Sequence, residues 1–98
     1  MKAVIETLIF TKQVDKIWSE DERLSFIDYI VQNPMAGDVI PNADGARKVR
    51  WTVKGTGKRG GVRVVYFNQD AEGVIYLIAI YQKSNKTNIT SKEIKQAI

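Results

Sequence analysis

The chain has 98 residues, a formal net charge of +4, and neither cysteine nor histidine. That length allows a single core that buries roughly 65% of the surface on folding, and an apolar content of 44% argues against disorder. A disulfide framework, a thiol nucleophile and a two-histidine ribonuclease are all excluded. Because no apolar run approaches the roughly 20 residues of a membrane span and no signal peptide opens the chain, we expect one cytoplasmic domain over residues 1–98.

The first third of the chain predicts a short strand followed by two helices. The strand is expected at residues 3–6, and apolar residues at helical spacing predict the first helix over residues 8–18. Ser19 and Glu22 form a capping box that starts the second helix, which is predicted to end near residue 32, before a proline. The inner stripe of this helix is expected to hold Leu24, Ile27 and Val31, widened by Phe26 and Ile30.

The remainder of the chain predicts an antiparallel meander and a last helix. A loop over residues 35–46 leads to strands expected at residues 47–53, 62–68 and 74–81, with short connections between them. Residues 90–93 form a second capping box, and the helix that it starts has only about two turns before the chain stops. Since so short a helix is unusual, we expect that a C-terminal piece is missing.

Basic residues gather in the second half of the chain. Residues 1–45 hold four basic and eight acidic residues, whereas residues 46–98 hold eleven basic and three acidic ones. Seven of the fifteen basic residues lie between Arg47 and Arg63, and no acid occurs between Gly45 and Gln69. Such an asymmetry favours a polyanionic partner, with nucleic acid as the first choice. A solvated basic face with no partner is the competing interpretation.

Alternation along the first basic strand separates two faces of the expected sheet. Val49 and Trp51 are expected to point into the core beneath the helices, whereas Lys48 and Arg50 point the other way. These two basic side chains would lie about 7 Å apart, a spacing that can straddle a phosphate. Antiparallel pairing could bring Arg63, at the start of the next strand, beside them. A charged face that only keeps the sheet soluble would show the same pattern.

The residue types on this face suit phosphate chemistry. Crowding of like charges disfavours the protonated form of a lysine, so a lysine here could act as general base on a ribose 2′-hydroxyl. Arginine keeps its proton and clamps a phosphate through paired hydrogen bonds as negative charge builds. Lys83 follows the last strand and could enter from the other flank. Of the aromatic residues, Tyr81 is the best candidate to stack on a base, ahead of Tyr66 and a Trp51 that we expect to be buried.

Nucleotide and metal sites are poorly supported. The loop Gly55–Gly61 contains Gly-Thr-Gly-Lys, but a phosphate-binding loop needs GxxxxGK[ST] before a helix, and here a strand follows. Its glycines instead favour a close approach of the backbone to a nucleic acid, in which Lys58 and Arg59 would contact phosphates. A flexible loop that only keeps the protein soluble is the competing interpretation. The acids of Glu20–Glu22 belong to a helix start. We expect no metal and no cofactor.

Four segments resemble the RelE/HigB superfamily of bacterial type II toxins, and the HigB branch in particular. They are Asn33-Pro34-x-x-Gly37-Asp38-Val39-Ile40-Pro41, Gly45-x-Arg47-Lys48-Val49-Arg50, Gly57-Lys58-Arg59-Gly60-Gly61-x-Arg63-Val64-Val65-Tyr66 and Tyr81-x-Lys83-Ser84. The resemblance covers nearly the whole chain. It implies an α+β domain in which an N-terminal helical hairpin packs on a twisted, mainly antiparallel four-stranded sheet with a concave basic face, followed by a short C-terminal helix.

The resemblance also implies an activity, partners and site residues. Members of the family cleave mRNA in the ribosomal A site, without a metal, and so inhibit translation. A cognate antitoxin, of the HigA-like helix-turn-helix type in this branch, neutralises them, and the complex binds operator DNA. By the family's pattern the catalytic positions are Lys48, Arg50, Arg63 and Lys83. The residues expected to contact RNA are Arg47, Lys54, Lys58, Arg59, Tyr81 and Lys86. Ser84 stands where some relatives have an arginine, and the catalytic tyrosine of their C-terminal segment is absent.

The leading hypothesis is therefore an mRNA endoribonuclease in which the 2′-hydroxyl attacks the adjacent phosphate. Lys48 would be the base, and Arg50 and Arg63 would stabilise the transition state. Two alternatives stay open. A ParE-like inhibitor that binds DNA gyrase without nuclease activity would leave this basic cluster without a role. A passive RNA-binding module would show salt-dependent affinity and no turnover.

Overall fold

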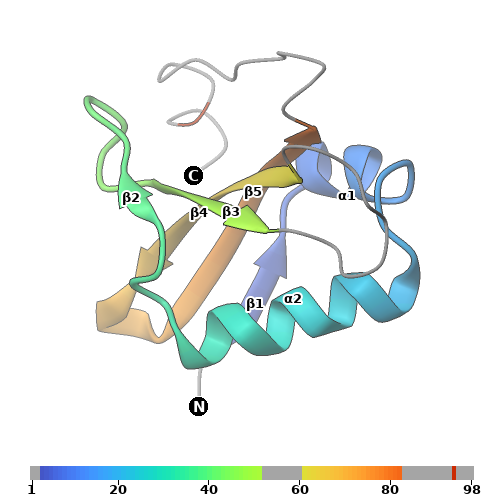
Figure 1. Cartoon of the computed structure of the whole chain (residues 1–98). Helices are drawn as coiled ribbons and strands as arrows, with labels where there is room; N and C mark the ends of the chain where they lie inside the picture. The colour runs from blue at the N-terminus through green and yellow to red at the C-terminus, as the bar shows by residue number, and fades with distance from the viewer. Residues whose placement is uncertain (1–2, 52–60, 83–93, 95–98) are drawn as a thin grey trace.

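The computed structural model describes residues 3–51, 61–82 and 94 of the chain, which form two helices and a five-stranded mixed sheet (Figure 1). The sheet order is β1-β5-β4-β3-β2. In chain order the elements are β1 (Ala3–Glu6), α1 (Leu8–Val14), α2 (Glu20–Gln32), β2 (Asp38–Val39), β3 (Arg47–Trp51), β4 (Val62–Gln69), a 3-10 turn (Asp70–Glu72) and β5 (Val74–Gln82). None of the helices in these ranges is long and apolar enough to cross a membrane.

The antiparallel meander of β3, β4 and β5 is confirmed, but the prediction of four strands is wrong. The first strand, β1, pairs in parallel with β5, so the sheet is mixed. The fifth strand is β2, two residues of the expected loop that pair with β3. The predicted C-terminal helix lies outside the described residues, except for Ile94, which is buried.

Helix α1 is shorter than the expected segment of residues 8–18. It ends at Val14, and residues 15–17 form a turn in which Lys16 and Ile17 donate backbone hydrogen bonds to carbonyls three residues earlier. Thr7 caps the start of α1, and its backbone N–H and hydroxyl both donate to the carbonyl of Leu77. These bonds fasten the start of the helix to β5, and they explain why a seven-residue helix is stable in this position.

The capping box of α2 is confirmed, and the expected inner stripe is right for Phe26, Ile27 and Ile30 but wrong for Leu24. Ser19 donates its backbone N–H to the Glu22 carboxylate (2.9 Å), and the Glu22 N–H donates to the Ser19 hydroxyl (3.3 Å). The helix turns Phe26 and Ile30 fully into the core, whereas Leu24 is 56% exposed. Ile27 and Val31 are only half-buried.

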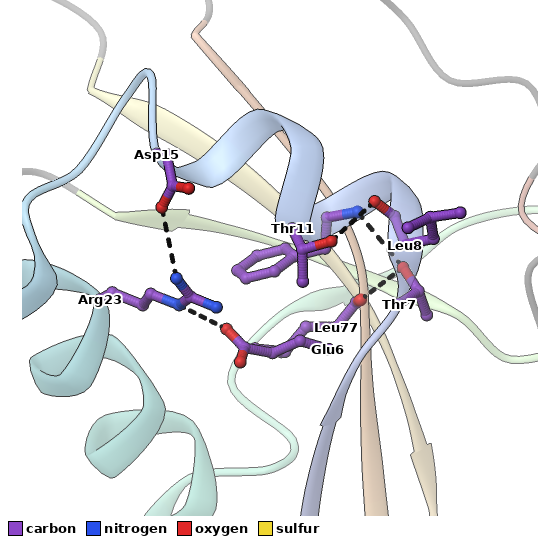
Figure 2. Close-up of polar contacts among 8 residues, drawn as sticks. Glu6, Thr7, Leu8, Thr11, Asp15, Arg23 and Leu77 are labelled. Atoms are coloured by element: carbon purple, nitrogen blue, oxygen red, sulfur yellow. Dashed lines mark hydrogen bonds and ion pairs between the residues drawn. The ribbon is translucent and has the colours of Figure 1, made fainter.

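An ion pair on the inner side of α2 accompanies this orientation of the helix. The side chain of Arg23 points toward β1, where its Nε lies 2.6 Å from Glu6 Oε2 (Figure 2). Its Nη1 lies 3.4 Å from Asp15 Oδ1, in the turn after α1. The hydrogen bond to Glu6 raises the pKa of Arg23, against the effect of burial. Arg23 therefore occupies the inner stripe together with Phe26, Ile27 and Ile30, at helical spacing, and Leu24 is turned to solvent.

Two apolar clusters cover the two faces of the sheet. The larger lies between the sheet and both helices, and it includes Phe10, Val14, Trp18, Phe26, Ile30, Val49, Val64, Tyr66 and Leu77. The smaller lies on the opposite face and consists of Ala43, Ala46, Val65, Ile78, Ala79 and Ile94. A β-bulge opposite Val65 and Tyr66 inserts Ile78 into β5, so that two successive β5 residues join the smaller cluster.

The segment between α2 and β3 is held by the hydroxyl of Tyr66. This hydroxyl donates to the Pro34 carbonyl (2.8 Å) and accepts from the Gly37 N–H (2.9 Å). Arg47 donates from Nη1 to the Gly37 carbonyl (2.7 Å). A Cβ on Gly37 would lie 2.8 Å from the Lys48 carbonyl oxygen, so only glycine allows this approach to β3. These contacts place Asp38 and Val39 beside β3 as the edge strand β2.

We expect Tyr66→Phe to lower the free energy of unfolding by about 1–3 kcal/mol, because the buried Gly37 N–H and the part-buried Pro34 carbonyl lose their partner. Burial raises the pKa of Tyr66, and the Gly37 hydrogen bond opposes it. The pKa of Tyr66 is therefore higher in the folded protein than in the unfolded chain. The protonated hydroxyl contributes its whole stabilisation below about pH 10, and this contribution is lost as the pH rises through the folded-state pKa.

Urea denaturation at neutral pH and at about pH 11 checks this prediction. The difference in stability between the wild type and Tyr66→Phe should narrow at the higher pH, because the variant has no hydroxyl to ionise. A difference that stays constant would contradict the role given to the Tyr66 hydroxyl.

Candidate nucleic-acid interface

The register of the meander lines up three candidate side chains across the face of the sheet that is opposite to the helices. Arg50 of β3 is paired with Arg63 of β4, and Arg63 is paired with Tyr81 of β5. Directly paired residues of antiparallel strands share a face, and neighbouring strands lie about 4.8 Å apart. Arg50, Arg63 and Tyr81 therefore form one row, called here the arginine–tyrosine row. Arg50 is exposed, and the other two residues are half-buried.

Lys48 lies in the neighbouring row, about 7 Å along β3 from Arg50. It is exposed and is paired with Val65, which belongs to the smaller apolar cluster. The basic side chains of Lys48, Arg50 and Arg63 therefore lie beside an apolar surface formed by Val65 of β4 and Ala79 of β5. Lys48 and Arg63 stand on backbone that is paired on both sides, and Arg50 stands on backbone paired with β4, which favours a fixed spacing between the three charges.

Asp38 is the functional candidate that sequence reasoning missed. It is exposed on β2 and is paired with Lys48, so an acid lies directly across from the lysine on the same face. The absence of acids between Gly45 and Gln69 gave no hint of it, because the acid comes from an earlier segment. The available signal was the Gly37-Asp38 pair, whose glycine permits the approach to β3.

Tyr81 is held in place by apolar packing and faces a cation. Its ring packs against the smaller apolar cluster, and its position in the register is directly across from Arg63. Burial raises the pKa of Tyr81, and the charge of Arg63 lowers it by a smaller amount. The phenol thus stays protonated at neutral pH and can donate a hydrogen bond or a proton.

Two other aromatic residues lie on the helical side of the sheet. Tyr66 is fully buried and its hydroxyl is bonded to Pro34, so the idea that it stacks on a base is wrong. Trp51 is half-buried, with its ring centroid 5.3 Å from that of Phe26 and 5.0 Å from that of Tyr29. Trp51 therefore lies on the core side of the sheet as expected, but it is half-buried and not fully buried.

Arg47 does not join Lys48 and Arg50. It is paired with Tyr66, on the helical side of the sheet, and its guanidinium donates to the Gly37 carbonyl. The other expected site residues, Lys54, Lys58, Arg59, Lys83 and Lys86, lie outside the described residues. Within residues 3–51, 61–82 and 94, no group of three or more acidic side chains is placed to hold a metal ion.

No family model matches the chain, but its fold is similar to that of the E. coli toxin RelE. A mutant of the E. coli toxin RelE in the free state matches with a TM-score of 0.64 and 14% identity, over 98% of this chain and 93% of that chain. A chain of the intact E. coli RelBE toxin–antitoxin complex matches with a TM-score of 0.61 and 16% identity, over 84% of this chain and 96% of that chain. The expectation of a RelE-like α+β fold is thereby confirmed.

Proposed function

We propose that the protein is a ribosome-dependent endoribonuclease toxin of the HigB branch, which cleaves mRNA in the ribosomal A site and so stops translation in the cytoplasm. The observation that carries the proposal is the arginine–tyrosine row, with Lys48 beside it, on the open face of a RelE-like sheet. Two arginines on neighbouring strands can hold the two sides of one phosphate through paired hydrogen bonds.

The proposed reaction uses the message's own 2′-hydroxyl as the nucleophile. Lys48 takes the proton of that hydroxyl, and the 2′-oxygen attacks the adjacent phosphorus. Arg50 and Arg63 stabilise the negative charge that builds on the phosphate oxygens. The products are a 2′,3′-cyclic phosphate and a 5′-hydroxyl. The groups named here need no metal. Lys83, which follows β5 in the sequence, is proposed as the fourth catalytic residue.

The ribosome supplies the orientation that this small site lacks. Lys48 and Arg50 are exposed, so they cannot by themselves fix a flexible single strand in the geometry for in-line attack. An oriented substrate lowers the barrier by a large entropic term. The remaining basic residues expected at the interface, Lys54, Lys58, Arg59 and Lys86, are proposed to hold the message or ribosomal RNA. Free RNA should therefore be cut poorly.

The proposed partner is a cognate antitoxin of the HigA-like, helix-turn-helix type, whose complex with this chain would bind operator DNA. Support comes from the matching chain of the RelBE structure, which is a toxin–antitoxin complex. The +4 charge of the chain favours a partner with acidic surface.

Primer extension on a defined message in a translating extract tests the proposed function. Wild type should produce cuts within the A-site codon, and Lys48→Ala should lose them. Lys12→Ala is the matched control, because Lys12 is an exposed lysine on α1, on the helical side. If expression of the wild-type protein stops the growth of cells while their mRNA stays intact, the proposal is overturned. Accumulated cleaved DNA–gyrase complexes would then identify the ParE-like alternative.

A further inference from the structure

The proposed cleavage needs a proton at the oxygen that leaves. When the 2′-oxygen bonds to phosphorus, the P–O5′ bond breaks, and an unprotonated 5′-alkoxide is a poor leaving group. General acid catalysis at such an oxygen contributes typically about 10²–10⁴-fold in rate. The roles given so far to Lys48, Arg50 and Arg63 leave this proton without a source.

Among the described side chains of this face that are paired with Arg50 or Arg63, the phenol of Tyr81 is the one suited to supply it. Arginine does not release its proton in proteins, and an ionised carboxylate only accepts hydrogen bonds. Tyr81 carries an O–H whose pKa is raised by burial, so the proton is present at neutral pH. Its ring is fixed against the smaller apolar cluster.

The position of Tyr81 in the sheet fits the geometry of in-line displacement. In that displacement the attacking and leaving oxygens lie on opposite sides of phosphorus, so the base and the acid must come from opposite sides as well. Lys48 stands on β3 and Tyr81 on β5, with Arg63 on the strand between them. The two outer strands are about 10 Å apart, which leaves room for a phosphate held above Arg63.

We propose that Tyr81 is the general acid of the cleavage reaction, in addition to any contact that it makes with RNA. This inference rests on the proposed function and names the residue that protonates the leaving oxygen. The proton of the 2′-hydroxyl passes to the neutral amine of Lys48, and the P–O2′ bond forms. The P–O5′ bond breaks, and O5′ takes the proton of the Tyr81 hydroxyl. The tyrosinate faces the Arg63 cation and regains a proton from water, while Lys48 returns its extra proton to solvent.

Tyr81→Phe tests the proposal, because it keeps the ring and removes only the hydroxyl. Single-turnover cleavage of ribosome-bound message should slow by about 10²–10⁴-fold, while binding to the ribosome is kept. Tyr76→Phe is the matched control, since Tyr76 is a half-buried tyrosine on the same face of β5, paired with Phe67 and Ile5, away from the arginines. Its rate should equal that of the wild type.

A message with sulfur in place of the bridging 5′-oxygen at the cleaved phosphate separates an acid from a merely structural tyrosine. A thiolate leaves without protonation, so Tyr81→Phe should cut this message nearly as fast as the wild type does. Arg63→Ala should stay slow on both messages. A Tyr81→Phe variant with full activity on the normal message, or with equal defects on both messages, would overturn the assignment. A wild type that cuts neither message would overturn the proposed function itself.

Discussion

Arg63→Ala is expected to slow the cleavage of ribosome-bound mRNA by about 10²–10³-fold, the loss typical of removing one donor to a charged transition state. Arg63 occupies the centre of the arginine–tyrosine row, between Arg50 on one side and Tyr81 on the other. Its guanidinium can therefore reach a phosphate that the groups on both outer strands also reach. Arg63→Lys should recover only part of the rate, because an ammonium is a point charge without the planar fork of donors.

Single-turnover rates at saturating ribosomes give the cleanest measurement of this effect, since they separate chemistry from binding. Lys12→Ala again serves as control, because it removes the same charge from the helical side of the molecule. A variant Arg63→Ala that binds more weakly but cuts at the normal rate once bound would show that Arg63 only attracts RNA. The passive RNA-binding module would then be the better interpretation.

Phe26→Ala is expected to lower the free energy of unfolding by about 3–5 kcal/mol, the usual cost of emptying a buried aromatic position. Phe26 is fully buried at the centre of an aromatic group, with ring centroids 5.3 Å from Trp18 and from Trp51. Trp51 belongs to β3, the strand that carries Lys48 and Arg50 on its other face. Because small domains have about 5–15 kcal/mol of stability in total, the loss should leave the variant close to unfolding.

Leu24→Ala on the same helix is the matched comparison for Phe26→Ala. Leu24 is exposed, so its truncation should change stability by no more than about 0.5 kcal/mol in urea denaturation. A larger loss of stability from Leu24→Ala than from Phe26→Ala would support the inner position of Leu24 that the sequence predicts. It would also contradict the orientation of α2 in which Phe26 is buried and Leu24 is exposed.

Patterns that act over short distances along the chain were enough to predict much of this fold. The capping box at Ser19 and Glu22 predicts the start of α2, and both of its hydrogen bonds form. Alternation along β3 predicts that Val49 is buried and Lys48 is exposed, and both are. Short connections predict the antiparallel order of β3, β4 and β5. Each of these features was predicted from residues that lie close together in the sequence.

Features that depend on distant partners were not predictable from the sequence in the same way. The inner stripe of α2 includes Arg23, whose partner Glu6 lies seventeen positions away, whereas the apolar pattern alone favoured Leu24. Arg47 looks like one more cation of the basic strand, but its hydrogen bond to the Gly37 carbonyl commits it to the fold.

The strand β2 is the clearest case for the candidate site. Two residues are too few to show any alternation, and β2 forms because the distant Tyr66 hydroxyl holds Gly37 against β3. Its formation brings Asp38 opposite Lys48. An acid therefore borders a cluster that appears purely basic in the sequence.

The most direct measurement is cleavage of a ribosome-bound message in which one ribose, the one 5′ to the cut phosphate, is replaced by 2′-deoxyribose. We predict that cleavage at that position disappears, and that the all-ribose message is cut to a 2′,3′-cyclic phosphate and a 5′-hydroxyl. Unchanged cleavage of the deoxy-substituted message would contradict the proposal that this basic face activates the message's own 2′-hydroxyl.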